Sequence, residues 1–228
     1  MTKKEYMEIE GFMQRRMQDS SHDMHHVYRV LNLALDIASH IDTKDTDVLI
    51  AACLLHDIGR GEQFTDLELC HATIGGEMAY EYLLSRKWPE LKALHVKECI
   101  SSHRFRKGGA PQSIEAKILF DADKLDVCGA IGIARTLVYG GQVGEPLYII
   151  DEEGNIETEG GGAEISSFFQ EFNYKHRKLS SAMFTERARE IAAARQKTAM
   201  DFYENLYAEI SDIYKNGIKR HEELLSDE

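Results

Sequence analysis

The sequence predicts an all-α protein. Apolar residues recur at three- and four-residue spacing through most of the chain, which is the period of a helix with one buried face. Capping residues or glycines bracket these segments, and only one short stretch, residues 147–150, reads as β-like. The length of 228 residues fits one large helical domain, or one with an appended helical subdomain, so a second independent catalytic domain is not expected.

The first half of the chain is expected to form amphipathic helices around one buried helix. Residues 3–17 form the first, and residues 20–23 offer N-cap chemistry to a second. The third, residues 45–58, is apolar almost all round and is therefore expected to be buried, ending at the glycines that follow it. Further helices are expected from His71 onward and near residues 96–103.

The second half is expected to contain longer helices separated by one loop. Residues 113–141 read as a single long buried helix, interrupted only by its last two glycines. A helix near residues 164–174 and a long one from about 185 to 213 follow. We therefore expect three parts: a helical core over residues 1–141, an acidic glycine-rich loop or short hairpin over 142–162, and a helical extension packed on the core over 163–228.

Composition limits the partners of the chain. With 27 Lys and Arg residues against 39 Asp and Glu, the formal net charge is −12, so the surface repels nucleic-acid polymers and acidic membranes. A substrate that carries phosphate must be attracted locally, by a metal or a small cationic cluster. The four cysteines lack CxxC pairing and read as reduced, packed thiols of a cytoplasmic protein without signal peptide or membrane span. A homodimer is left open.

Metal-binding side chains stand inside otherwise apolar helices: His26, His56, Asp57 and Asp123. Imidazole nitrogens and carboxylate oxygens are ligands that divalent metals of the first transition row favour. Burying an unpaired carboxylate is costly, so these aspartates require a cation or hydrogen-bond partners. The sequence thus predicts a divalent metal site, for which Asp121, Asp123 and Asp126 compete as the last ligand.

Spaced motifs make this prediction more specific. HDMHHVYRV, LLHDIG and DADKLD, in this order, resemble the H…HD…D signature of the HD superfamily of metal-dependent phosphohydrolases, and the chain is similar to small bacterial HD hydrolases. The resemblance is strong over residues 21–141 and weaker beyond. It implies an all-α HD-domain bundle whose metal ligands are His26, His56, Asp57 and Asp123, the last because a lysine directly follows it.

The resemblance also implies roles around the metal. His71 and His103 stand where two-metal relatives place additional histidines, and they are expected to ligate a second ion or to contact phosphate and protonate the leaving group; a single ion is favoured. Lys124 is expected to face substrate phosphate. Further cationic contacts with substrate are expected from three arginines: Arg29, Arg104 and Arg106.

The implied function is hydrolysis of a nucleotide or other small phosphate ester by a metal-activated water, which Asp57 helps to orient. The metal could be Mn, Co, Ni, Fe or Mg. The bond cleaved could be a phosphate monoester, the α–β bridge of a nucleotide or a cyclic diester. Two other functions are weighed against hydrolysis: a non-catalytic nucleotide sensor and a metal-dependent oxygenase on the same scaffold.

Overall fold

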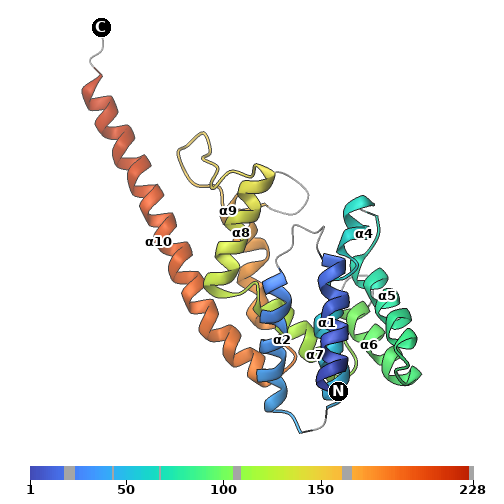
Figure 1. Ribbon diagram of the computed structural model, residues 1–228. Helices are drawn as coiled ribbons and strands as arrows, with labels where there is room; N and C mark the ends of the chain where they lie inside the picture. Colours follow the sequence, from blue (N-terminus) through green and yellow to red (C-terminus); the bar gives the residue numbers. More distant parts are fainter. Residues whose placement is uncertain (18–23, 43, 67, 105–108, 161–165, 226–228) are drawn as a thin grey trace. The chain divides into compact units, whose positions relative to one another are not determined.

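The computed structural model describes residues 1–17, 24–42, 44–66, 68–104, 109–160 and 166–225 (Figure 1). Within these ranges the chain forms ten α-helices and one 3₁₀ helix and no strand, so the expected all-α fold class is confirmed. None of the described helices is long and apolar enough to cross a membrane. The expected N-cap in residues 20–23 and the expected substrate contact Arg106 lie outside the described residues.

The chain folds as two compact units. The first comprises residues 1–126 and 184–188, and the second comprises residues 127–183 and 189–228. The division at residues 141 and 162 expected from the sequence stays a prediction.

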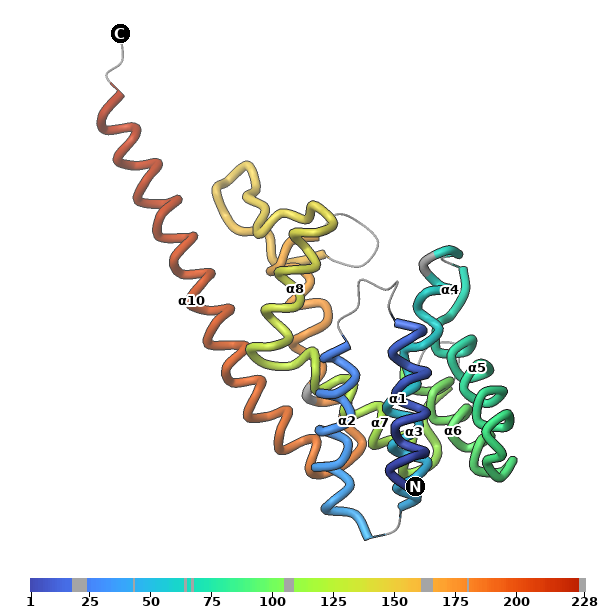
Figure 2. The backbone as a smooth tube through the Cα atoms, in the orientation of Figure 1, coloured from blue at the N-terminus to red at the C-terminus, as the bar shows by residue number. Residues whose placement is uncertain are grey.

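The first unit is built around α3. Its helices are α1 (Lys3–Met17), α2 (Met24–Ser39), α3 (Thr46–Leu55), α4 (Arg60–Thr65), α5 (His71–Ser85), α6 (Glu90–Ser102) and α7 (Ile114–Leu125). Helix α3 contacts α1, α2, α5, α6 and α7 and lies among them (Figure 2). Residues 51–55 of this helix are completely buried, as expected for a helix that is apolar on every side.

A tight turn follows α3 and carries the HD pair. The helix ends at Leu55, so His56 and Asp57 lie in the turn before α4. Gly59 in this turn packs against the start of α5: a Cβ on Gly59 would lie 2.6 Å from the backbone nitrogen of Gly75 and would also overlap the carbonyl of His71. The lack of a side chain at Gly59 therefore allows α5 to pack directly against the turn.

The single long helix expected over residues 113–141 is wrong, because the chain breaks after Leu125 and resumes as α8 (Gly129–Val143). Gly129 has φ +69°, and a Cβ at this position would lie 2.9 Å from Cβ of Arg195. Only glycine adopts this conformation readily and fits this space. Helix α8 then continues through Gly140 and Gly141 and ends at Val143, followed by the C-cap Gly144, whose φ is +77°.

The second unit has an aromatic core. Its elements are α8, α9 (Phe168–Tyr174), the 3₁₀ helix η1 (His176–Ala182) and most of α10 (Glu186–Leu224), which runs eleven residues beyond the end expected near residue 213. Phe169 packs edge-on against Tyr203, with ring centroids 5.1 Å apart. Within the acidic glycine-rich segment, Ile150 and Ile156 form an antiparallel bridge, and Ile156 is buried in this core.

Candidate metal centre

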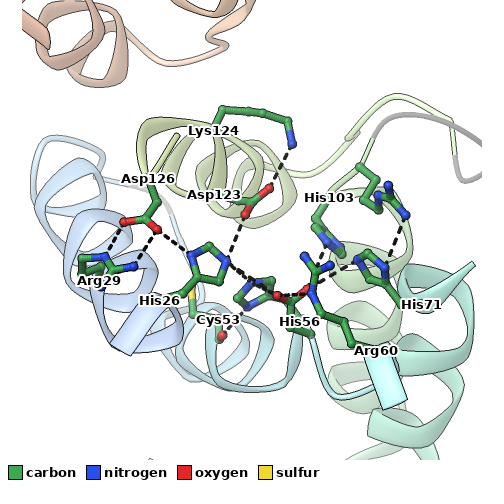
Figure 3. Close-up of polar contacts among 12 residues, drawn as sticks. His26, Arg29, Cys53, His56, Arg60, His71, His103, Asp123, Lys124 and Asp126 are labelled. Atoms are coloured by element: carbon green, nitrogen blue, oxygen red, sulfur yellow. Dashed lines mark hydrogen bonds and ion pairs between the residues drawn. The ribbon is translucent and has the colours of Figure 1, made fainter. Parts of the chain in front are cut away.

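Two groups of potential metal ligands converge in the first unit (Figure 3). The first group contains His26 from α2, His56 from the turn after α3 and Asp123 from α7, and the second contains Asp57, His71 and His103. Within each group, one ligand atom per residue lies within 4.8 Å of the others. Five segments separated by up to 97 positions in the sequence therefore meet at one place.

Asp57 lies between the two groups and faces both. Its Oδ2 atom is 3.6 Å from Nε2 of His26 and 3.5 Å from Nε2 of His56. Its Oδ1 atom is 3.4 Å from Nε2 of His71 and 3.9 Å from Nε2 of His103. A different oxygen of the same carboxylate is therefore directed at each group, which is an arrangement that can hold one cation or bridge two.

The Asp57 carboxylate is charged and almost completely buried. The residue is 1% exposed, and neither oxygen has a hydrogen-bond partner among the described residues. Nε of Arg60 forms an ion pair with Oδ2 at 2.6 Å, although its N–H is not aligned for a hydrogen bond. Burial works to raise the pKa of Asp57, but His56 and Arg60 hold it well below its usual value. The site therefore presents a negative group that a cation would neutralise.

The four histidines turn the same ring nitrogen towards the carboxylates. Each places Nδ1 against an oxygen outside the two groups, at the following distances: His26 to Asp126 Oδ2, 2.7 Å; His56 to Cys53 O, 2.8 Å; His103 to Ile100 O, 2.6 Å; His71 to Gln63 Oε1, 2.5 Å. Carboxylate, carbonyl and amide oxygens only accept, so Nδ1 carries the proton and donates in every case. Each Nε2 therefore lies among the two groups, where a metal ion would take the place of any proton on that nitrogen.

The pKa of His26 is raised, whereas the pKa values of the other three histidines are lowered. Burial lowers the pKa of His26, but hydrogen bonds to Asp123 and Asp126 outweigh this effect and raise it to about 9. Burial is also the largest influence on His71 and His103, and their pKa values fall to about 2 and about 4. His71 and His103 are thus held as neutral rings with a free lone pair.

The three aspartates that competed for the last ligand position occupy different environments. Asp123 belongs to the first ligand group, with Oδ1 3.4 Å from Nε2 of His26. Asp121 instead accepts hydrogen bonds from Phe184 N at 2.9 Å and from Thr185 N at 2.7 Å. Asp126 accepts a hydrogen bond from Nδ1 of His26 and belongs to neither ligand group. The structure therefore places Asp123, and neither of the other two, among the candidate ligands.

Cationic side chains flank the site, but they do not share one role. Lys124 donates to Oδ2 of Asp123 at 2.9 Å, and Nη1 of Arg104 lies 3.3 Å from Nδ1 of His71. That second contact is longer than the bond from His71 to Gln63, which we take to fix the proton on Nδ1. Arg29, expected to contact substrate, donates to both oxygens of Asp126.

Sequence reasoning missed three residues at this site. Arg60 directly follows the HDIG motif, and that position was the available signal for it. The sequence presents Asp126 as one of three competing ligands, and Gln63 belongs to a polar segment without a distinguishing pattern. Partners such as these depend on which helices meet, which a single sequence does not specify.

Comparisons with known proteins agree with this geometry. The HD domain family model matches residues 24–128. The chain is 30% identical to the Bacillus subtilis (strain 168) protein YpgQ over 201 residues, which cover 86% of this chain and 88% of YpgQ. The crystal structure of YpgQ in complex with ADP matches with a TM-score of 0.70 and 27% identity, over 90% of this chain and 95% of that one.

Two further solved structures are similar. An HD-superfamily hydrolase from Bacillus thuringiensis matches with a TM-score of 0.68 at 27% identity, over 90% of this chain and 96% of its own. A predicted HD superfamily hydrolase from an uncultured Thermotogales bacterium matches with a TM-score of 0.62 at 28% identity, over 89% and 91%. These matches confirm the resemblance drawn from the motifs, and the chain belongs to the HD domain superfamily, among small bacterial proteins similar to YpgQ.

Proposed function

We propose that this protein is a divalent-metal-dependent phosphohydrolase that acts on a nucleotide or another small phosphate ester. The observation that carries the proposal is the Asp57 carboxylate, which is 1% exposed, has no hydrogen-bond partner among the described residues and faces four histidine Nε2 atoms. Besides its ion pair with Arg60, this buried carboxylate can be stabilised by a divalent cation held between it and the four imidazoles. Imidazole and carboxylate donors suit Mn, Co, Ni and Fe, and the carboxylates also suit Mg.

The proposed ligands of this ion are His26, His56, Asp57 and Asp123. A divalent ion in such a site lowers the pKa of bound water and withdraws charge from phosphoryl oxygens. Asp57 has a second oxygen, Oδ1, which faces the second group, where it can bind a second ion or, with one ion bound, accept a hydrogen bond from the attacking water. Asp57 is a ligand in either case, and with a single ion it also orients the nucleophile.

His71 and His103 act as lone-pair donors in this proposal. Their pKa values of about 2 and about 4 leave both rings neutral at physiological pH, and Nδ1 of each already donates to a fixed acceptor. Their Nε2 atoms can bind a second ion. This role replaces protonation of the leaving group, for which a neutral histidine with so low a pKa is poorly suited.

The phosphate end of the substrate would be neutralised by three side chains at the rim: Arg60, Lys124 and Arg104. Arg60 and Lys124 already pair with Asp57 and Asp123, so their positive charges lie beside the proposed ion. A chain with a net charge of −12 requires such a local positive region in order to attract an anionic substrate. The complex of YpgQ with ADP supports a nucleotide as the ligand.

The test is metal analysis of the purified protein, followed by assays of phosphate and pyrophosphate release. A panel of nucleoside mono-, di- and triphosphates and cyclic nucleotides would be offered with Mn, Co, Ni and Mg. We expect release that depends on the added metal and disappears with a chelator. Thermal stabilisation by nucleotides without turnover would instead favour a sensor. Bound iron together with oxygen consumption would favour an oxygenase.

A further inference from the structure

We infer that Asp126, held in place by Arg29, is a positioning residue that fixes the ring of His26 and strengthens Nε2 of that ring as a metal ligand. The inference rests on the proposed function, because it assigns a role to residues that do not themselves face the proposed ion. Figure 3 shows the three side chains in a row, with Asp126 between Arg29 and His26.

The first step is the contact between Asp126 and His26. Both residues are buried, at 1% and 2% exposed, and Nδ1 of His26 lies 2.7 Å from Oδ2 of Asp126. A carboxylate can only accept, so the hydrogen bond places the proton of the neutral ring on Nδ1. The opposite nitrogen, Nε2, is thereby directed at Asp123, 3.4 Å away, and at Asp57, 3.6 Å away.

The second step is the charge of the acceptor. Among the four histidines of the two ligand groups, only His26 donates from Nδ1 to a carboxylate; the other three acceptors are two backbone carbonyls and a side-chain amide. A negatively charged acceptor increases the electron density of the imidazole and the basicity of its other nitrogen. His26 is therefore expected to be the strongest histidine donor of the site.

The third step is the support of Asp126 by Arg29. Nε of Arg29 donates to Oδ1 at 2.6 Å and Nη2 donates to Oδ2 at 3.1 Å, so the guanidinium holds both oxygens in one plane. Arg29 lies three residues after His26 on α2, which places both side chains on one face of that helix. Two side chains of α2, His26 and Arg29, therefore donate hydrogen bonds to Asp126, the C-cap of α7.

This arrangement gives Arg29 a different task from the one expected from the sequence. Its guanidinium neutralises a buried carboxylate that would otherwise be strongly disfavoured. We therefore assign Arg29 to the support of Asp126 and not to contact with substrate phosphate.

The experiment compares Asp126→Asn and Asp126→Ala with Asp121→Asn by calorimetric titration of metal-free protein with Mn²⁺ at one pH. Removing a partner of this kind from a ligating histidine typically weakens metal affinity by about 10- to 100-fold, and we expect this loss for the alanine variant. The asparagine variant should lose less, because its amide oxygen can still accept the Nδ1 proton but carries no charge.

Asp121→Asn is the matched control. Asp121 lies on α7, of which Asp126 is the C-cap, and is also buried, but its carboxylate accepts hydrogen bonds from Phe184 and Thr185 and belongs to neither ligand group. We expect a lower melting temperature of the metal-free protein and an unchanged Mn²⁺ affinity. If both Asp126 variants also keep the wild-type affinity and lose only melting temperature, the positioning role is refuted. Should the alanine variant fail to fold, the affinity of the asparagine variant decides.

Arg29→Gln separates support from substrate binding. The positioning role predicts a weaker Mn²⁺ affinity in the absence of any substrate, whereas a phosphate contact predicts a raised KM with metal affinity intact. The second result would overturn the assignment of Arg29. A wild-type protein that binds no divalent ion would remove the proposed function itself, which distinguishes that failure from a failure confined to the variants.

Discussion

Gly59 and Gly75 approach so closely that a Cβ added to Gly59 would lie 2.6 Å from the backbone nitrogen of Gly75. This contact joins the turn that carries Asp57 to the first part of α5, which begins at His71. The distance of 3.4 Å between Nε2 of His71 and Oδ1 of Asp57 therefore depends on the absence of a side chain at Gly59.

Gly59→Ala should consequently destabilise the protein and increase the distance between Asp57 and His71, two members of the second ligand group. Because the neighbouring atoms are backbone and cannot rotate away, we expect a loss of about 1–3 kcal/mol, as for other overpacked sites. Thermal unfolding of the variant measures this loss. Gly61→Ala is the control: Gly61 lies inside α4, nothing would lie within 4 Å of its Cβ, and alanine is the better helix former. Equal melting temperatures for both variants would contradict the close-approach argument.

His56→Ala and Asp57→Ala should each abolish tight binding of metal and all hydrolysis. Both side chains are proposed ligands. Helix α3, which precedes them, is held in place by its own buried apolar residues and does not depend on either side chain. Far-ultraviolet circular dichroism should therefore stay close to that of the wild type, while elemental analysis finds no bound metal. Full activity in either variant would refute the assignment of the centre.

The number of ions can be tested through His71 and His103. The sequence favoured one ion, but the two oxygens of Asp57 face different ligand groups, and we now expect two ions per chain. Elemental analysis under saturating metal should give two equivalents for the wild type and one for His71→Ala or His103→Ala. One equivalent in all three proteins, with a lower kcat in the variants, would restore the single-ion arrangement.

His176 in the second unit should make stability depend on pH. Burial is the main cause that lowers its pKa; the neighbouring Lys175 acts in the same direction, whereas Glu171 and the carbonyl of Val127 oppose it. Nδ1 of His176 donates to that carbonyl at 3.1 Å. The native state thus prefers the neutral ring. Since the folded pKa lies below the unfolded value of about 6.5, this contribution is complete above that value and is lost as pH falls through the folded pKa.

The measurement is the melting temperature at pH 7.5 and pH 5 for the wild type and His176→Gln. The variant should be less stable at pH 7.5, and its melting temperature should fall less on acidification. His221→Gln, at an exposed position on α10, serves as the control and should behave like the wild type. Identical acid sensitivity in the wild type and His176→Gln would show that this ring does not govern the effect.

The sequence predicted the features that depend on local pattern. The apolar spacing indicated the helices. The combination of His26, the HD pair and Asp123 indicated one site, because buried carboxylates require a cation or hydrogen-bond partners. The break between α7 and α8 could not be predicted, because it depends on the positive φ of Gly129 and on its close approach to Arg195.

Long-range pairs escaped prediction for a related reason. Arg29 and Asp126 are 97 residues apart, and a basic residue one turn from a ligand suggests a phosphate contact equally well. Only the packing of α2 beside the end of α7 shows that the guanidinium turns towards a protein carboxylate.

The hydrogen bonds of Asp121 show which parts of the chain a shortened version of this protein would need to keep. Its buried carboxylate is satisfied by Phe184 and Thr185, and residues 184–188 accordingly belong to the first compact unit, although 57 residues of the second unit separate them from residue 126. Arg187 adds an ion pair with Asp36 of α2 at 3.1 Å. A chain truncated at residue 126 would lack this short segment and the three hydrogen bonds that Phe184 and Thr185 donate to the buried Asp121 carboxylate. We therefore expect the stretch matched by the family model, residues 24–128, to be less stable when excised alone than when residues 184–188 are kept with it.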